Sequence, residues 1–272
     1  MTATRVGFVG LGSQGAPMAR RIAEAGYPTT LWARREATLA PFADTPARAA
    51  GSLAALAADA DLACVCVVDD AGVEEVVTGL LEVMRPGATI AVHSTVHPDT
   101  CRRLADRASA RGIALLDAPV SGGAPAAAAG TLLVMAGGDA EVLERVRPVF
   151  ATYSDPIVHL GPVGAGQRAK LINNLVLTAN LGVAESAYSL AGPLEVDPAQ
   201  LAVVLAHGTG FSKATAMVRA PAFDLARMGP VAGRLLRKDV RLLADLVDAA
   251  GAKADTVLGA ADAALESMGW AR

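Results

Sequence analysis

Residues 7–26, GFVGLGSQGAPMARRIAEAG, decide the fold of the first half of the chain. A short apolar run leads into glycines at positions 10, 12 and 15, and helical spacing follows up to Gly26, a residue type that commonly ends helices. A strand, a glycine-rich turn and a helix in this order are typical of the unit that opens a parallel α/β fold. In this unit Gly10 permits a tight turn, Gly12 lets the backbone approach a pyrophosphate, and Gly15 allows the helix to pack closely on the strand.

The same loop predicts a dinucleotide-binding site. Phosphate groups bind over a helix N-terminus, where backbone N–H groups point outward and the helix dipole favours negative charge. Glycines alone would be weak evidence, because an ordinary glycine-rich turn binds nothing, but the strand–turn–helix context that the motif requires is present. We expect Leu11 and Gln14, which lie between the glycines, to border the cofactor together with Gly10, Gly12 and Gly15.

The end of the second apolar run indicates which dinucleotide binds. Residues 31–36 are LWARRE, so the run ends on Arg34 and Arg35, with Glu36 just beyond. An acidic residue here would bond the ribose hydroxyls of NAD, whereas a basic residue accommodates the additional phosphate of NADP, which guanidinium groups bind in bidentate geometry. The sequence therefore favours NADP. NAD stays open as the alternative, with the two arginines facing solvent and Glu36 in the acidic role.

The rest of the first half alternates strand and helix patterns. Strands separated by helices need crossover connections and form a mostly parallel sheet, whose strands are covered on both faces and are therefore continuously apolar. We expect strands at residues 5–10, 29–35, 62–68, 88–95, 114–120 and 131–138. Helices are expected at residues 16–26, 37–60, 73–87 and 99–112, the second of them broken by Pro41 and Pro46.

The pattern changes after Gly161 and Pro162. The later segments have helical spacing, and no apolar run among them is typical of a strand; these segments are residues 169–192, 198–208, 235–251 and 254–269. The expected fold class is α/β, with an NAD(P)-binding, Rossmann-type doubly wound sheet in residues 1–161. An all-α domain in residues 162–272 would contribute to the substrate site and to dimerisation. Both sizes are usual for domains.

Composition limits the other function classes. The 272 residues are 53% hydrophobic and carry a net charge of -3, which is typical of a globular protein and argues against a nucleic-acid partner. No apolar run is long enough to span a membrane. The histidines are scattered, and Cys64 and Cys66 lie in a buried-strand pattern, so we expect no metal. Three cysteines without framework spacing, and an N-terminus without a signal peptide, favour the cytoplasm.

Five ordered segments of the chain resemble the β-hydroxyacid dehydrogenase family, a group that includes 3-hydroxyisobutyrate dehydrogenase and is related to 6-phosphogluconate dehydrogenase. The segments are GFVGLGSQGAPMA (7–19), VHSTVHPDT (92–100), DAPVSGGAPAAAAGTLLVMAGG (117–138), GAGQRAKLINN (164–174) and RKDVRLL (237–243). Together they cover nearly the whole chain. Five motifs in the family's order are far more specific than any one of them.

The resemblance implies that Lys170 is the catalytic acid or base and that Asn174 holds the substrate beside it. The chemistry agrees, since moving a hydride between an alcohol and nicotinamide leaves one proton for a positioned group to manage. Burial near Leu171 and Leu175 would favour the neutral amine. Lys170 and Asn174 are four residues apart and share a helix face. Asn173 can face either the ligand or the other domain, and its role stays open.

The resemblance also implies the remaining contacts. The substrate carboxylate would be bound by Ser121, Gly122 and Gly123, whose backbone N–H groups can form an anion-binding nest after a strand. The cofactor would be bordered by four further residues, which are Val67, Val68, Thr95 and Lys238. Of these, Thr95 would contact the nicotinamide end and Lys238 would reach the cofactor from the helical domain. The expected ligand is a small carboxylate.

Two alternatives to a dehydrogenase of a β-hydroxy acid stay open. Imine reductases resemble this family but usually lack the lysine, so Lys170 and the DAPVSGG segment argue against that substrate class. The other alternative is a non-catalytic cofactor-binding or interaction module, because fold alone does not fix function. In either case the apolar stripes LAVVLA (201–206) and LLADLV (242–247) predict a homodimer or a higher homo-oligomer.

Overall fold

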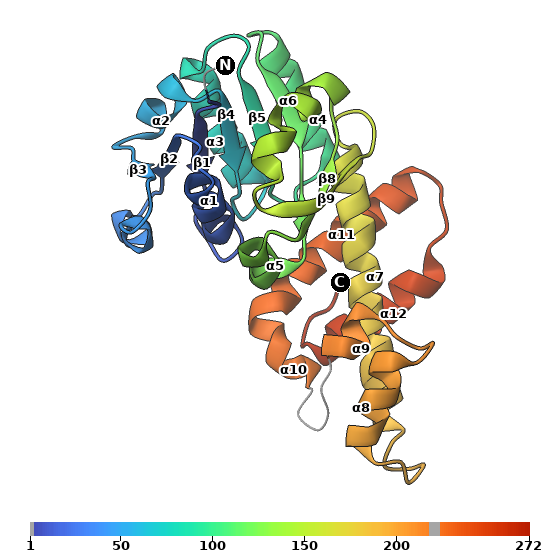
Figure 1. The fold of residues 1–272 in the computed structure, drawn as a ribbon. Coiled ribbons are helices and arrows are strands. Elements are labelled where there is room, and N and C mark those ends of the chain that lie inside the picture. The colour runs from blue at the N-terminus through green and yellow to red at the C-terminus, as the bar shows by residue number, and fades with distance from the viewer. Residues whose placement is uncertain (1–2, 218–223) are drawn as a thin grey trace. The chain divides into compact units, whose positions relative to one another are not determined.

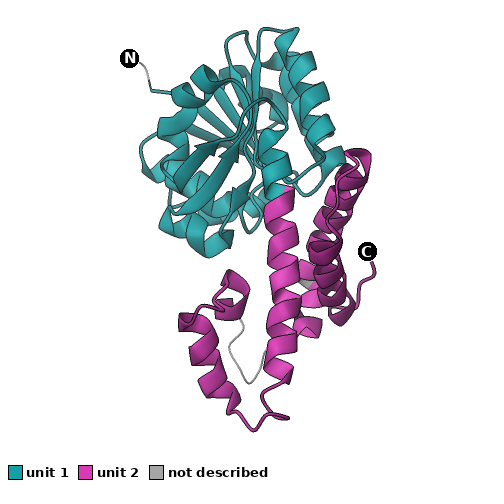
Figure 2. Ribbon diagram, turned by 90° about the vertical axis from the view of Figure 1, so that its right-hand side faces the viewer, with its two compact units in different colours: residues 1–170 teal, residues 171–272 magenta. Residues whose placement is uncertain are grey.

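The computed structural model describes residues 3–217 and 224–272 and divides into two compact units, residues 1–170 and 171–272 (Figure 2). The long helix α7 (Ala165–Ser189) crosses this division, so its first residues belong to unit 1 and the rest to unit 2. Each unit has a hydrophobic core of its own.

Unit 1 is built on a parallel six-stranded sheet (Figure 1). Its strands, in the order β3-β2-β1-β4-β5-β6, are β1 (Val6–Val9), β2 (Thr29–Trp32), β3 (Arg48–Ala49), β4 (Leu62–Val65), β5 (Thr89–Val92) and β6 (Ala114–Asp117). This is the strand order of a doubly wound dinucleotide-binding fold, so the expected fold class is confirmed. The order reverses between β1 and β4, and such folds bind their ligands outside the carboxyl ends of the strands at this point.

Helices cover both faces of the sheet. They are α1 (Gly15–Glu24), α2 (Leu53–Asp59), α3 (Asp70–Val83), α4 (Pro98–Ser109) and α6 (Ala140–Phe150). Successive residues of β1 show the two-sided burial, because neighbouring side chains of a strand point to opposite faces. Phe8 packs into the core that includes α1 and α6, and Val9 packs into the core that includes α2, α3 and α4.

The strand expected at residues 131–138 exists but does not join the six-stranded sheet. As β8 (Leu132–Ala136) it lies in a second sheet between β7 (Val120–Ser121), which is antiparallel to it, and β9 (Ser154–His159), which is parallel. The short helix α5 (Gly123–Ala129) joins β7 to β8. The chain leaves β6 through Pro119, which has no N–H to continue a ladder. The sequence did not predict β9, because this half-exposed edge strand has no continuous apolar run.

The helix expected over residues 37–60 is wrong for most of its length. The segment holds the 3-10 helix η1 (Glu36–Phe42), the strand β3 and the helix α2. Pro41 and Pro46 lack the N–H that a continuous helix needs, and β3 pairs with β2 at the edge of the sheet. Since β3 consists of two exposed residues, no apolar pattern could indicate it.

All the secondary-structure elements in the described part of unit 2 are helices. After α7 it contains α8 (Pro198–His207), α9 (Lys213–Met217), α10 (Leu225–Met228), the π-helix η2 (Gly229–Gly233), α11 (Arg234–Ala249) and α12 (Asp255–Ser267). Its core gathers apolar residues of α7, α11 and α12, among them Leu175, Leu243 and Leu265. Within the stripe at residues 242–247, Leu243 is buried in this core and Leu242, Leu246 and Val247 pack against it half-buried, so its role in subunit contact stays a prediction. Among the described helices, none is both long and apolar enough to cross a membrane.

Candidate active site

The three glycines of the loop after β1 have different surroundings. A β-carbon at Gly10 would lie 2.1 Å from a carbonyl oxygen just beyond β4, and one at Gly15 would lie 1.9 Å from the carbonyl oxygen of Gly10. At Gly12 a β-carbon would meet nothing within 4 Å, which leaves an open approach to the N-terminus of α1. Leu11 is buried in the core beneath the loop, and Gln14 is half-buried at the start of α1. This cradle fits the phosphates of a dinucleotide.

Two further pairs of expected cofactor residues follow β2 and β4, the strands on either side of β1. Val67 and Val68 lie in the loop after β4, and Val68 is 62% exposed although it is apolar. Arg34 and Arg35 are exposed in the turn after β2, which ends at Trp32 and is shorter than predicted. Within residues 3–217 and 224–272 neither arginine forms an ion pair, so both guanidinium groups can meet a phosphate.

Thr95, expected at the nicotinamide end, is half-buried in the loop after β5. Its neighbour Ser94 accepts a hydrogen bond from the N–H of Val67 at 2.8 Å. This bond joins the loop after β4 to the loop after β5. Because β4 and β5 are adjacent parallel strands, both loops lie at the carboxyl edge of the sheet.

His93, the residue before Ser94, is buried and neutral. Its Nδ1 donates to the carbonyl oxygen of Ala118 at 2.7 Å, because a carbonyl can only accept, and its Nε2 then accepts from the hydroxyl of Tyr153 at 3.2 Å. Burial lowers the pKa of His93 to about 4. The ring thus ties the loop after β5 to the segment after β6. Sequence reasoning assigned it no role.

The expected substrate residues Ser121, Gly122 and Gly123 lie where β7 gives way to α5. Gly122 has a φ of 131° and Gly123 a φ of 76°, backbone conformations that residues with a β-carbon rarely adopt. Ser121 is half-buried and Gly122 is exposed. Consecutive backbone N–H groups in such a turn suit a carboxylate. The segment starts from the carboxyl end of β6, at the edge that carries the cofactor loops.

Asp117, the last residue of β6, is a further member of this region that sequence reasoning missed. It is fully buried, and its two carboxylate oxygens accept from the N–H of Gly164 at 2.6 Å and of Gln167 at 2.8 Å. Burial raises the pKa of this carboxyl, against the effect of the two donors. A charged residue at the end of a buried strand was the signal in the sequence, since such a group needs a partner.

Lys170 lies in the second turn of α7 and is 9% exposed, so its amine is largely withdrawn from solvent. It is the last residue of unit 1. Asn174 follows four residues later on the same helix and is also buried. The start of α7 is attached to the strand ends through Asp117, so Lys170 belongs to the same edge of the sheet as the expected substrate loop.

In unit 2 the structure brings together Asn173, Asn174 and Lys238 around Asp239. The side-chain amide of Asn174 donates to Asp239 at 2.6 Å, and the amide of Asn173 donates to the side-chain oxygen of Asn174 at 3.1 Å. The ammonium of Lys238 lies 3.1 Å from the other oxygen of Asp239. Asp239 is only 4% exposed. Sequence reasoning missed Asp239, which orients the amide of Asn174 and holds Lys238 near it.

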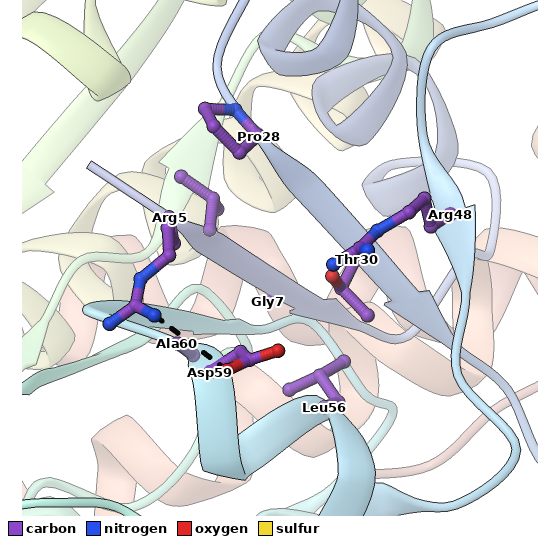
Figure 3. A pocket seen from close by; sticks show the side chains of 9 residues that line it. Arg5, Gly7, Pro28, Thr30, Arg48, Leu56, Asp59 and Ala60 are labelled. Atoms are coloured by element: carbon purple, nitrogen blue, oxygen red, sulfur yellow. Dashed lines mark ion pairs between the residues drawn. The ribbon is translucent and has the colours of Figure 1, made fainter. Parts of the chain in front are cut away.

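A small cavity lies away from these residues. It has a volume of about 30 Å³ and lies at the opposite, amino-terminal end of the sheet. Its lining includes Gly7, Thr30 and Asp59 (Figure 3). That volume suits a water molecule rather than a substrate. Among the described residues, no group of three or more His, Cys, Asp or Glu side chains could hold a metal ion.

Comparison with known proteins identifies similar families for both parts of the chain. Residues 5–161 match the NAD-binding domain of 6-phosphogluconate dehydrogenase. Residues 164–269 match the NAD-binding domain of NADP-dependent 3-hydroxyisobutyrate dehydrogenase.

The similar individual proteins include named dehydrogenases. The 3-hydroxyisobutyrate dehydrogenase of Pseudomonas aeruginosa is 33% identical over 268 residues, which are 94% of this chain and 89% of the relative. The NAD-dependent L-serine dehydrogenase of the same organism is 40% identical over 196 residues, 70% of this chain and 66% of the relative. The structure of Mycobacterium tuberculosis 3-hydroxyisobutyrate dehydrogenase with L-serine has a TM-score of 0.84 at 31% identity, covering 97% of this chain and 94% of that one.

Proposed function

Because the chain belongs to the β-hydroxyacid dehydrogenase family and is an NAD(P)-dependent hydroxy-acid oxidoreductase, we propose that Lys170 is its general acid or base. The reaction would interconvert a small β-hydroxy acid and its semialdehyde. One observation carries this proposal: a buried lysine on a helix whose start is bonded to the strand end that leads into the expected substrate loop. Lysine is almost never fully buried unless it is paired, so this position is unusual for its residue type.

The proposed mechanism moves one hydride and one proton. The bound cofactor supplies the hydride acceptor at its nicotinamide ring. Lys170 in its amine form takes the proton from the substrate hydroxyl, so that no free alkoxide forms, and in reduction the ammonium form returns a proton to that oxygen. Burial of Lys170 excludes water, which strengthens its interaction with the reacting oxygen.

The expected substrates carry a carboxylate, which supports residues 121–123 as the loop that binds them. Relatives named for L-serine and 3-hydroxyisobutyrate act on acids whose hydroxyl stands on the β-carbon. We expect Ser121, Gly122 and Gly123 to hold such a carboxylate through side-chain and backbone donors. Asn174 would bond the reacting hydroxyl with the amide hydrogen that it does not donate to Asp239.

For the cofactor we propose NADP, with NAD as the alternative. The exposed guanidinium groups of Arg34 and Arg35 after β2 support NADP, because they suit the additional phosphate. The NAD-dependent serine dehydrogenase among the relatives supports the alternative, in which Glu36 bonds the ribose. Lys238 keeps its predicted role toward the cofactor.

Assembly and compartment complete the proposal. We propose that the functional domains are residues 1–161 and 162–272 and that the chain forms a homodimer or higher homo-oligomer through α7 and α8. Exposed apolar side chains on these two helices support the homo-oligomer, among them Ile172, Val183, Val203 and Val204. Three free cysteines support a reducing compartment such as the cytoplasm.

The test is a substrate panel measured with NADP and with NAD, using 3-hydroxyisobutyrate, L-serine, C3 and C4 semialdehydes and a cyclic imine. We expect turnover of a β-hydroxy acid or its semialdehyde, with the higher kcat/KM for NADP. Lys170→Ala should lower kcat by about 100-fold or more, the usual contribution of a general acid or base. Lys253→Ala, at an exposed position of unit 2, is the matched control and should retain activity.

Three results would contradict the proposal. Normal turnover by Lys170→Ala would exclude the lysine from proton transfer. Turnover of the imine alone would assign the chain to imine reduction. Absence of NADPH and NADH binding in a fluorescence titration would favour a non-catalytic module.

A further inference from the structure

We propose that Asp117 and Gln167 are positioning residues that clamp the first turn of α7 and thereby hold Lys170 in register with the loops after β5 and β6. The inference rests on the proposed role of Lys170. All of these groups lie in unit 1. Neither Asp117 nor Gln167 contacts the reacting atoms in this proposal, so each acts through Lys170.

Asp117 supplies the first half of the clamp. Its Oδ1 accepts from the N–H of Gly164 at 2.6 Å and its Oδ2 accepts from the N–H of Gln167 at 2.8 Å, so one carboxylate satisfies two N–H groups at the start of α7. A carboxylate at this position also complements the positive end of the helix dipole. Asp117 is the last residue of β6, four residues before Ser121. The carboxylate therefore joins the lysine helix to the strand that leads into the substrate loop.

Gln167 supplies the second half of the clamp. It is fully buried, its side-chain oxygen accepts from the N–H of Val96 at 3.1 Å, and its side-chain amide donates to the carbonyl oxygen of Ser94 at 2.8 Å. These two bonds bracket Thr95, the residue expected at the nicotinamide end. One glutamine thus sets the distance between α7 and the loop after β5.

The residues around the clamp are so closely packed that there is no room for a β-carbon at Gly166 or Gly137. A β-carbon at Gly166 would lie 2.2 Å from the carbonyl oxygen of Met135 and 2.9 Å from Oδ2 of Asp117. A β-carbon at Gly137 would lie 2.5 Å from Oδ1 of Asp117. The helix start therefore touches the second sheet directly. The glycines of the GAGQRAK segment allow the start of α7 to pack this closely. Lys170 is then the residue of this segment that we propose takes part in the chemistry.

The position of the first turn of α7 affects the reaction rate because Lys170 lies close to this turn on the same helix. Lys170 follows Gln167 by three residues, which is about 4.5 Å of helix rise. Because the two residues are so close on one helix, a displacement of the first turn displaces Lys170 by about the same distance. A misplacement of about 1 Å at a reacting group can lower a rate by about 100-fold. We therefore expect loss of the clamp to lower kcat while leaving cofactor binding at the loop after β1 unchanged.

The first experiment compares Asp117→Asn with Asp139→Asn. Asp139 caps α6 in the same unit by accepting from the N–H of Val142 at 3.0 Å, so its loss removes a helix cap far from α7 in sequence. We expect both variants to lose stability, whereas only Asp117→Asn speeds hydrogen exchange at the Gly164 and Gln167 amides. Exchange is measured without substrate. Unchanged exchange at these two amides, or equal acceleration in both variants, would overturn the clamp.

The second experiment is a double-mutant cycle with Lys170→Ala, using the substrate of the panel that the unaltered chain turns over fastest. We expect Asp117→Asn to lower kcat by about 10- to 100-fold, with the KM for the cofactor changed less than about twofold. In the Lys170→Ala background the same change should have almost no further effect, because positioning acts only through the lysine.

The outcomes separate the two proposals. An equal loss of kcat in both backgrounds would show a merely structural role and overturn the clamp, while leaving Lys170 as the acid or base. Normal activity of Lys170→Ala would overturn the proposed function, and the exchange result would still decide whether Asp117 seats the helix. If Asp117→Asn does not fold, Gln167→Met replaces it, because this change removes both bonds to the loop after β5 and keeps the side-chain length.

Discussion

The glycines at positions 10, 12 and 15 are alike in the sequence motif but perform different tasks in the structure. Gly10 and Gly15 face backbone atoms of the protein itself, at 2.1 and 1.9 Å from the β-carbon that another residue would carry. Gly12 faces open space. Folding therefore depends on Gly10 and Gly15, whereas Gly12 leaves open the space in which we propose that the cofactor binds.

Alanine substitution should separate these tasks. We expect Gly15→Ala to destabilise the fold by about 1–3 kcal/mol or more, since the new methyl group overpacks the contact between α1 and β1. Gly12→Ala should keep its melting temperature but weaken NADPH binding by about tenfold or more, equivalent to about 1.4 kcal/mol. Thermal unfolding and fluorescence titration measure the two effects. A Gly12→Ala chain that binds NADPH normally would show that the pyrophosphate does not approach this residue.

At the scale of elements, the end of β5 joins its neighbours through buried polar groups. His93 bonds the segment after β6 and the hydroxyl of Tyr153, and Ser94 bonds the N–H of Val67 after β4. Residues of a single strand end thus fix the loops on both sides of it. The neutral ring of His93 makes this connection dependent on pH.

His93 should make the folded state less stable in mild acid. Its pKa falls from 6.5 to about 4 on burial, so the unfolded chain takes up a proton at a pH where the folded chain does not. The stabilisation is complete above pH 6.5 and is lost as the pH falls toward 4. Between pH 7.5 and pH 5 the loss should be about 2 kcal/mol, measured by urea unfolding.

Variants isolate the contribution of this residue. His93→Gln should reduce stability at neutral pH and remove about one proton from the pH dependence of unfolding. His207→Gln, which changes an exposed histidine of α8, should keep the dependence of the unaltered chain. A His93→Gln chain with the full pH dependence would assign the effect to other groups.

At the scale of the whole molecule, unit 2 carries several large apolar side chains that are exposed instead of packing into its core. α8 has no buried residue, and Val203 and Val204 on it are 55% and 61% exposed. On α7, Ile172, Val176 and Val183 are also exposed. An apolar surface of this kind marks an interaction site, and a second copy of the chain is the partner that we propose.

An aspartate on this surface should disrupt the assembly. We expect the unaltered chain to sediment as a dimer or larger oligomer at micromolar concentration and Val204→Asp to sediment as a monomer, because a charge cannot be buried in an apolar interface without a partner. Val158→Asp, at an exposed apolar position of β9 in unit 1, is the control and should not change the sedimentation. A monomeric unaltered chain would contradict the proposed homo-oligomer.

The sequence alone predicted the features that depend on local chemistry and spacing. The segment at residues 7–26 identified the fold because a strand, a glycine-rich turn and a helix follow one another directly in the sequence. The buried strands of the parallel sheet were visible as apolar runs, and the order of five motifs identified the family. Lys170 and Asn174 could be placed on one helix face because helical spacing is regular.

Only the tertiary structure decided which surfaces and polar groups meet. Nothing in the apolar pattern of β8 distinguishes the second sheet from the first, because strand pairing depends on where Pro119 turns the chain. The stripe at residues 242–247 was apolar in sequence, but whether it faces a core or a partner depends on how α11 packs. The partners of Asp117 and Gln167 could not be predicted for the same reason: they lie more than forty residues away along the chain, and the type of a side chain does not determine which group it bonds.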